Sequence, residues 1–74
     1  STAIASERRD FLIKLMEKVS EVERVLLIQK EVEGLTIEEL AQMMGLNENT
    51  IKVKLFRARR KLVKAAGKLG HRMP

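Results

Sequence analysis

The sequence predicts an all-α domain of four helices, and three observations support this fold class. Apolar residues recur every three to four positions through most of the chain, as they do on one face of an amphipathic helix. Ser20 and Thr36 are each followed three positions later by Glu, which is the pattern of a helix-capping box. The only Pro is residue 74, and hardly any stretch alternates as a strand does. With 74 residues, the chain is expected to form a single domain, residues 1–74.

The first helix is predicted to follow Ser6, a favourable N-cap, with Glu7 and Asp10 in its first turns. Residues 1–5 are expected to form a frayed start. Apolar side chains at helical spacing then form a stripe that we assign to the core. The stripe consists of Phe11, Leu12, Leu15, Met16 and Val19.

Ser20 and Glu23 begin a second helix that is predicted to continue to about Val32. Gly34 is expected to end it, because Gly enters the left-handed conformation at little cost. On or near its buried side we expect Val22, Val25, Leu26, Gln29 and Val32, with Ile28 partly buried. Leu27 could face elsewhere, but the run VLLI is apolar enough to be largely buried.

Thr36 and Glu39 begin a third helix, which Gly45 is expected to end with a positive φ. Leu35 lies one residue before the cap, where it can pack against Leu40 as a hydrophobic staple. The inward face should carry Ile37, Leu40, Ala41 and Met44, and Leu46 should fill the turn that follows.

The fourth helix is predicted over Glu48–Ala66, with Asn47 as its N-cap and residues 67–74 as a frayed basic tail. At about 100° per residue, one stripe faces the core. That stripe is Ile51, Leu55, Ala58 and Leu62. The opposite face holds Asn49, Val53, Phe56, Arg57 and Arg60, flanked by Lys52.

Two helices joined by a Gly-containing turn over residues 36–66 form the pattern of a helix-turn-helix. The expected architecture is a three-helical DNA-binding core similar to that of winged-helix proteins but without a wing. Phe56 and Val53 among cations suit a major groove, where apolar atoms contact thymine methyls and Arg contacts guanine. The alternative is that these two side chains belong to a satellite core or a partner contact.

The charge distribution points to the same end of the chain. Net charge is +5, yet residues 1–48 hold six basic and ten acidic side chains, whereas residues 49–74 hold nine basic and no acidic ones. Binding to a polyanion is the natural use of such a surface, because neutralising phosphates releases counterions. A solvated basic tail is the alternative, but it predicts scattered charges rather than charges patterned on one helix.

Composition argues against several other functions. There is no Cys and the only His is His71, so we expect no disulfide, no metal site and no cofactor. Glu38 and Glu39 are adjacent and diverge on a helix, so no catalytic pair is expected and an enzyme is not predicted. No apolar run approaches the roughly 20 residues of a membrane span. We expect a cytoplasmic protein and, since the chain begins with Ser, a fragment of a longer one.

One family resemblance covers residues 11–66. The segments SEVERVLLIQKEVEGL, TIEELAQMMGLNENTIK and LFRARRKL are similar to region 4 of bacterial sigma factors, most closely the extracytoplasmic-function group. The run TIKVKLFRAR at residues 50–59 is the most specific part, since members carry a similar T-[VI]-[KR]-x-[KR]-[LI]-x-R-A-R string. The chain departs from the family at Val19-Ser20, often Leu-Pro, and at Asn49, often a small residue.

The resemblance implies a domain that recognises the −35 promoter element for RNA polymerase. Carried over by position, the residues near bases are Lys52, Val53, Phe56 and Arg57. Those on or near the DNA backbone are Thr36, Asn49, Thr50, Arg59 and Arg60. The implied protein partners are the flap of the polymerase β subunit and an anti-sigma factor.

Two other functions compete with this one. A response-regulator output domain of the quorum-sensing type has a similar four-helix layout, but it normally continues to His and Asn rather than to RARRKL. The second competing function is not DNA binding: the basic segment 50–69 would instead bind a membrane surface or a partner helix. That requires a free apolar face, whereas Ile51, Leu55 and Leu62 are needed to cover the preceding helices.

Overall fold

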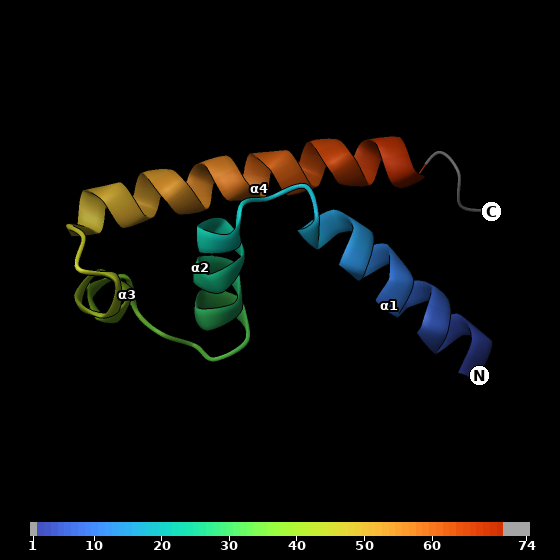
Figure 1. Cartoon of the computed structure of the whole chain (residues 1–74), viewed down its shortest axis with the longest axis horizontal. Helices are drawn as coiled ribbons and strands as arrows, with labels where there is room; N and C mark the ends of the chain where they lie inside the picture. Colours follow the sequence, from blue (N-terminus) through green and yellow to red (C-terminus); the bar gives the residue numbers. More distant parts are fainter. Residues whose placement is uncertain (1, 71–74) are drawn as a thin grey trace.

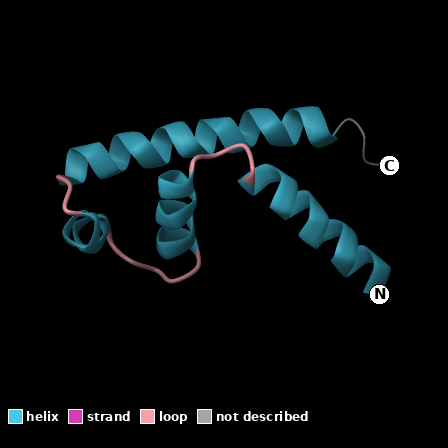
Figure 2. Ribbon diagram, viewed as in Figure 1, coloured by secondary structure: helices cyan, strands magenta, loops and turns pink. Residues whose placement is uncertain are grey.

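Helix α4 (Glu48–Gly70) is the element against which the three other helices pack. In the computed structural model, which describes the backbone of residues 2–70 and the side chains of residues 5–68, it is preceded by α1 (Thr2–Met16), α2 (Glu21–Glu31) and α3 (Ile37–Met44). All three lie on the same side of α4 (Figure 1). Residues 2–70 contain helices, turns and loops but no strand, so the all-α prediction is confirmed over that range (Figure 2).

The core lies where α2, α3 and α4 meet. Its largest side chains are Leu26, Leu40, Ile51 and Leu55, each exposed by 1% or less. Ala58 is also fully buried, and Leu62 packs against the cluster from the next turn of α4. The core stripe predicted for the fourth helix is therefore confirmed.

The predicted caps are present. Ser20 and Glu23 form one capping box and Thr36 and Glu39 the other, with side-chain-to-backbone distances of 2.8–3.1 Å. The Asn47 side chain accepts a hydrogen bond from the Thr50 amide at 2.7 Å and so caps α4. These contacts depend on residues three positions apart, which is why the local sequence predicts them.

Gly45 closes α3 with φ +68° and ψ +32°, as the sequence predicts. Its amide donates to the Ala41 carbonyl, and so does the amide of Leu46 at 3.0 Å. Leu46 packs against the core from the turn. Gly34, after α2, also has a positive φ of +76°. The turn at Gly34 thus leads into α3, and the turn at Gly45 leads into α4.

The buried side predicted for α2 is wrong for most of its residues. Leu27, for which the sequence left both sides open, is buried. Exposed instead are Val22, Val25, Ile28 and Val32, the last by 75%. Glu23 accounts for the rotation, because its carboxylate must face inward to bond the Ser20 amide and the Lys61 ammonium. The spacing of apolar residues alone does not predict that Glu23 faces inward.

Both terminal helices are longer than predicted. Helix α1 begins at Thr2 rather than after Ser6, and α4 runs through Gly67 to Gly70 rather than ending at Ala66. A Cβ at Gly67 would meet no atom within 4 Å, and a Gly inside a helix costs only about 1 kcal/mol relative to Ala. Extending a helix already formed is favourable enough to tolerate that. The last part of the predicted tail, residues 71–74, lies outside the described residues.

The stripe predicted for α1 is confirmed only in part. Val19 is buried, while Phe11, Leu15 and Met16 are half-buried. Leu12, expected in the core, is 59% exposed. Figure 1 explains this, since α1 meets the rest of the domain at its C-terminal end and projects away at its N-terminal end.

Truncation of Leu55 tests the packing of α4. Leu55→Ala should destabilise the domain by about 2–5 kcal/mol, because it removes a buried side chain and leaves a cavity between α4 and its neighbours. Denaturant unfolding measures the change. Lys52→Ala on the exposed side of the same helix is the matched control and should change stability by less than about 0.5 kcal/mol. Equal stability of the Leu55→Ala variant and the parent would contradict the described core.

The turn at Gly45 gives a second prediction. A Cβ added at Gly45 meets no neighbouring atom within 4 Å, so the main cost of a substitution comes from the backbone conformation. Gly45→Val should lose roughly 1–2 kcal/mol, the cost of a left-handed conformation for a residue with a Cβ. Gly45→Asn should lose less, because Asn tolerates this region better. If the Gly45→Asn variant had a lower unfolding free energy than Gly45→Val, the positive φ would not be what determines the cost of a substitution at this position.

Candidate nucleic-acid interface

The outward face of α4, which we define as Asn49, Lys52, Val53, Phe56, Arg57 and Arg60, points away from the other helices. All six residues are exposed, Val53 by 38% and Phe56 by 60%. None belongs to the core cluster or to the half-buried residues packed on it. Within residues 5–68, whose side chains are described, Phe56 and Val53 therefore do not form a satellite core.

Phe56 and Arg60 contact each other on this face. The guanidinium carbon of Arg60 lies over the Phe56 ring, 5.8 Å from its centroid. That separation is within the range of a cation–π interaction. The two residues are one helical turn apart, so the contact follows from their four-residue spacing.

The cations on either side of Arg60 point elsewhere. Arg59 Nη2 lies 2.6 Å from Glu31 Oε1, and Lys61 Nζ lies 2.7 Å from Glu23 Oε1. Both acidic partners belong to α2. Of these three consecutive basic residues, Arg59 and Lys61 therefore form ion pairs with α2, whereas Arg60 lies on the outward face.

The pair of Lys61 and Glu23 is partly buried. The Lys61 ammonium, and then the Ser20 amide, hold the pKa of the Glu23 carboxyl below its ordinary value, against burial, which raises it. The pair of Arg59 and Glu31 is exposed on both sides, with side chains 49% and 57% accessible. Exposed pairs contribute about 0–1 kcal/mol, so Arg59 can exchange Glu31 for another anion at little cost.

The remaining residues predicted near DNA lie at helix starts. Thr50 is half-buried in the first turn of α4. Thr36 is the N-cap of α3, and its hydroxyl and amide are both bonded to Glu39, whose carboxyl pKa they lower. Helix geometry leaves the first amides of α3 without intrahelical partners. Two carboxylates, Glu38 and Glu39, share that turn.

Two basic residues not singled out from the sequence extend this surface. Lys64 and Lys68 follow Arg60 at four-residue intervals and are exposed. The spacing itself is the signal that could have identified them. Sequence reasoning also missed Glu31 and Glu23 as partners of Arg59 and Lys61, since these lie 28 and 38 residues away.

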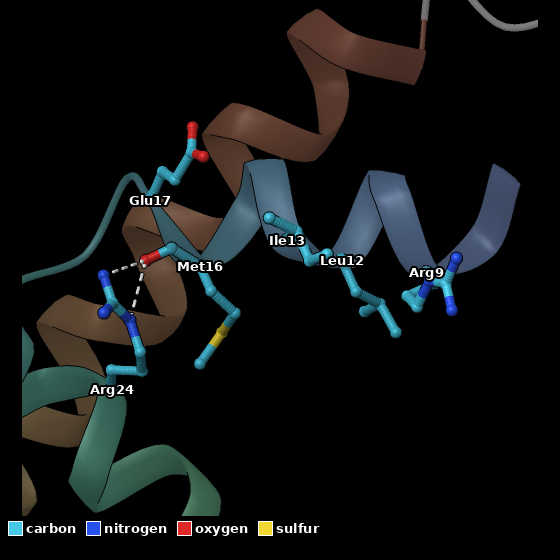
Figure 3. Close-up of a pocket in the computed structure, with 6 residues that line it drawn as sticks. All are labelled: Arg9, Leu12, Ile13, Met16, Glu17 and Arg24. Atoms are coloured by element: carbon cyan, nitrogen blue, oxygen red, sulfur yellow. Dashed lines mark hydrogen bonds between the residues drawn. The ribbon is translucent and has the colours of Figure 1, made fainter. Parts of the chain in front are cut away.

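Two shallow hollows lie elsewhere. One, of about 430 Å³, is lined by residues of α3 and the turn after it, including Gln42, Gly45 and Asn47. The other, of about 350 Å³, lies between α1 and α2, where Arg24 donates two hydrogen bonds to the Met16 carbonyl (Figure 3). Among the described residues no group of three or more His, Cys, Asp or Glu is placed to hold a metal ion.

A Gly-closed turn between α3 and α4, with a basic and partly apolar outward face on the second helix, defines a helix-turn-helix DNA-binding domain. The chain belongs to the family "Sigma-70, region 4", whose model matches residues 11–62. This family is a non-enzymatic DNA-binding domain of sigma factors, which act with RNA polymerase on promoter DNA. No curated protein and no solved structure gives a significant match to the chain.

The long α4 is strongly charged. No helix within residues 2–70 combines the length and apolar character needed to cross a bilayer.

The link between α2 and α4 predicts a pH dependence of stability. A carboxyl whose folded pKa is depressed stabilises the fold above its unfolded pKa of about 4.3 and loses that contribution as pH falls through the folded value. The melting temperature should therefore drop as pH falls below about 5, and Glu23→Gln should flatten this slope. Lys61→Met should flatten it as well, because Lys61 is the largest cause of the shift. Parallel curves for the parent and Glu23→Gln would contradict this.

Proposed function

We propose that this domain recognises the −35 promoter element as part of an extracytoplasmic-function-type sigma factor, with the outward face of α4 in the major groove. One observation carries the proposal, namely that Val53 and Phe56 are exposed beside Arg57 on the side of α4 that does not pack against the core built by the described residues. Exposing a Phe to water is unfavourable, and a groove that supplies thymine methyls and guanine edges gives both side chains a partner.

Within this proposal the residues have two roles. Lys52, Val53, Phe56 and Arg57 contact base edges. The residues on the phosphate backbone are Thr36, Asn49, Thr50, Arg59 and Arg60, with Lys64 continuing the same line. Arg59 would exchange Glu31 for a phosphate, and Thr36 would present the first amides of α3.

We propose the flap of the polymerase β subunit as the protein partner, and an anti-sigma factor as the regulator that covers these surfaces, in the cytoplasm where transcription takes place. The exposed apolar residues of α2 and of its C-cap are a candidate surface for such a partner, since DNA held on α4 would leave them free. These are Val22, Val25, Ile28 and Val32.

The membrane-surface alternative is less well supported. An interfacial helix needs its apolar side free to enter the lipid. In α4 that side is occupied, because Ile51, Leu55 and Ala58 are buried against α2 and α3. The quorum-sensing alternative shares the helix-turn-helix, but the family match over residues 11–62 does not favour it.

Truncating Arg57 and truncating Arg60 are predicted to change DNA binding in different ways. Arg57→Ala should cost about 1–3 kcal/mol on the best site and relax the preference at one base pair, because a base contact is lost. Arg60→Ala should weaken all duplexes alike and reduce the salt slope by about one ion, because a phosphate contact is lost.

The measurement is binding of each variant, in the sigma factor that carries this domain and assembled with core RNA polymerase, to single-base promoter variants at several salt concentrations. Both variants should melt like the parent, since neither side chain belongs to the core. A uniform loss for Arg57→Ala, with the base preference intact, would rule out this assignment of the outward face.

A further inference from the structure

We propose that Phe56 is a positioning residue for Arg60, holding its guanidinium on the outward face of α4 before DNA arrives. The inference rests on the proposed function, in which Arg60 contacts a phosphate. It adds a second role to Phe56, which the family resemblance places near a base only. The observation behind it is that the guanidinium carbon of Arg60 lies over the Phe56 ring, 5.8 Å from its centroid.

The neighbours of Arg60 show why positioning is needed. Arg59 and Lys61 are each held by a carboxylate of α2, at 2.6 and 2.7 Å. The two ion pairs found among the described residues therefore leave Arg60 out. An exposed Arg without a carboxylate partner samples many rotamers, and binding a phosphate must then restrict them.

Phe56 is suited to reduce that cost. It lies one turn before Arg60 on the same face, and α4 is a continuous helix on both sides of it. Phe56 is 60% exposed, which leaves room for the guanidinium on one side of its side chain and for DNA on another. A planar guanidinium keeps its N–H groups at the rim when it stacks, which leaves them free for phosphate oxygens.

The contact has a specific chemical requirement. It needs an aromatic ring at position 56, because the attraction comes from the negative face of the ring rather than from its apolar area. Phe56→Leu therefore keeps an apolar side chain for a thymine methyl and removes the support of Arg60. Phe56→Tyr keeps the ring and should preserve the support.

The test is a double-mutant cycle in the sigma factor that carries this domain, assembled with core RNA polymerase, using a panel of single-base promoter duplexes at fixed salt. Averaged over the panel, Phe56→Leu should weaken binding by about two- to fivefold, the size of an exposed cation–π contact. In the Arg60→Ala background the same substitution should have no such averaged effect. Phe56→Tyr keeps the ring face, so Arg60→Ala should weaken binding as much in the Phe56→Tyr background as it does in the parent.

Arg57→Ala supplies the matched control background, since Arg57 also lies on the outward face but is not stacked on Phe56. There, Phe56→Leu should retain its full averaged effect. If instead the losses from Phe56→Leu and Arg60→Ala simply multiply, Phe56 does not act through Arg60 and the positioning role is wrong, while the proposed function stands. If Arg60→Ala leaves binding unchanged, the positioning role and the phosphate contact of Arg60 both fail. A parent that shows no promoter preference would overturn the proposed function itself.

Discussion

The Glu23 carboxylate is the interaction on which the orientation of the helices depends. One oxygen accepts hydrogen bonds from the Ser20 amide at 2.8 Å and from the Lys61 ammonium at 2.7 Å. The first bond caps α2 and the second ties α2 to α4. A carboxylate exposed by only 7% is stable as an anion only with such partners, so it fixes the rotation of α2 about its axis. Leu26 and Leu27 are buried in the core in the same orientation of α2.

The same tie sets the rotation of α4. Lys61 and Arg59 both point towards α2, and Ile51, Leu55 and Ala58 face the core. A helix fixed along one side presents its opposite side outward, because side chains follow a fixed angular repeat. The outward face of α4 is therefore defined by what the other side buries and by what α2 holds.

The sequence predicts those parts of the structure that depend on neighbours along the chain. Both capping boxes and the positive φ of Gly45 involve residues within a few positions, so their patterns are visible locally. The core stripe of α4 is equally clear because polar and apolar residues alternate at helical period. The outward face follows as its complement, and its exposure agrees with the prediction even though its contacts with DNA stay a proposal.

What the sequence does not predict depends on distant partners. In α2, all four side chains of the run Val25–Ile28 are apolar, so periodicity does not identify the buried side. The choice is made by Lys61, 38 residues from Glu23. The predicted burial of Leu12 is wrong for a related reason. An apolar stripe on α1 does not reveal how much of that helix packs against the rest of the domain. Charge counts likewise did not reveal that Arg59 is paired with Glu31.

This pairing changes how the basic charge of residues 49–74 relates to DNA affinity. Each phosphate neutralised by a cation contributes about 0.9 to the salt slope, so the relevant number is that of cations facing DNA. Lys61 is held in a partly buried pair whose loss would strand the Glu23 carboxylate, and it is therefore unavailable to a phosphate. Arg59 is intermediate, because its exposed carboxylate partner can be replaced. Arg60 lies over a neutral ring rather than beside a carboxylate, so its charge is not offset by a partner in the chain's described ion pairs. Three adjacent basic residues thus contribute unequally, and only the packing of α4 against α2 distinguishes them.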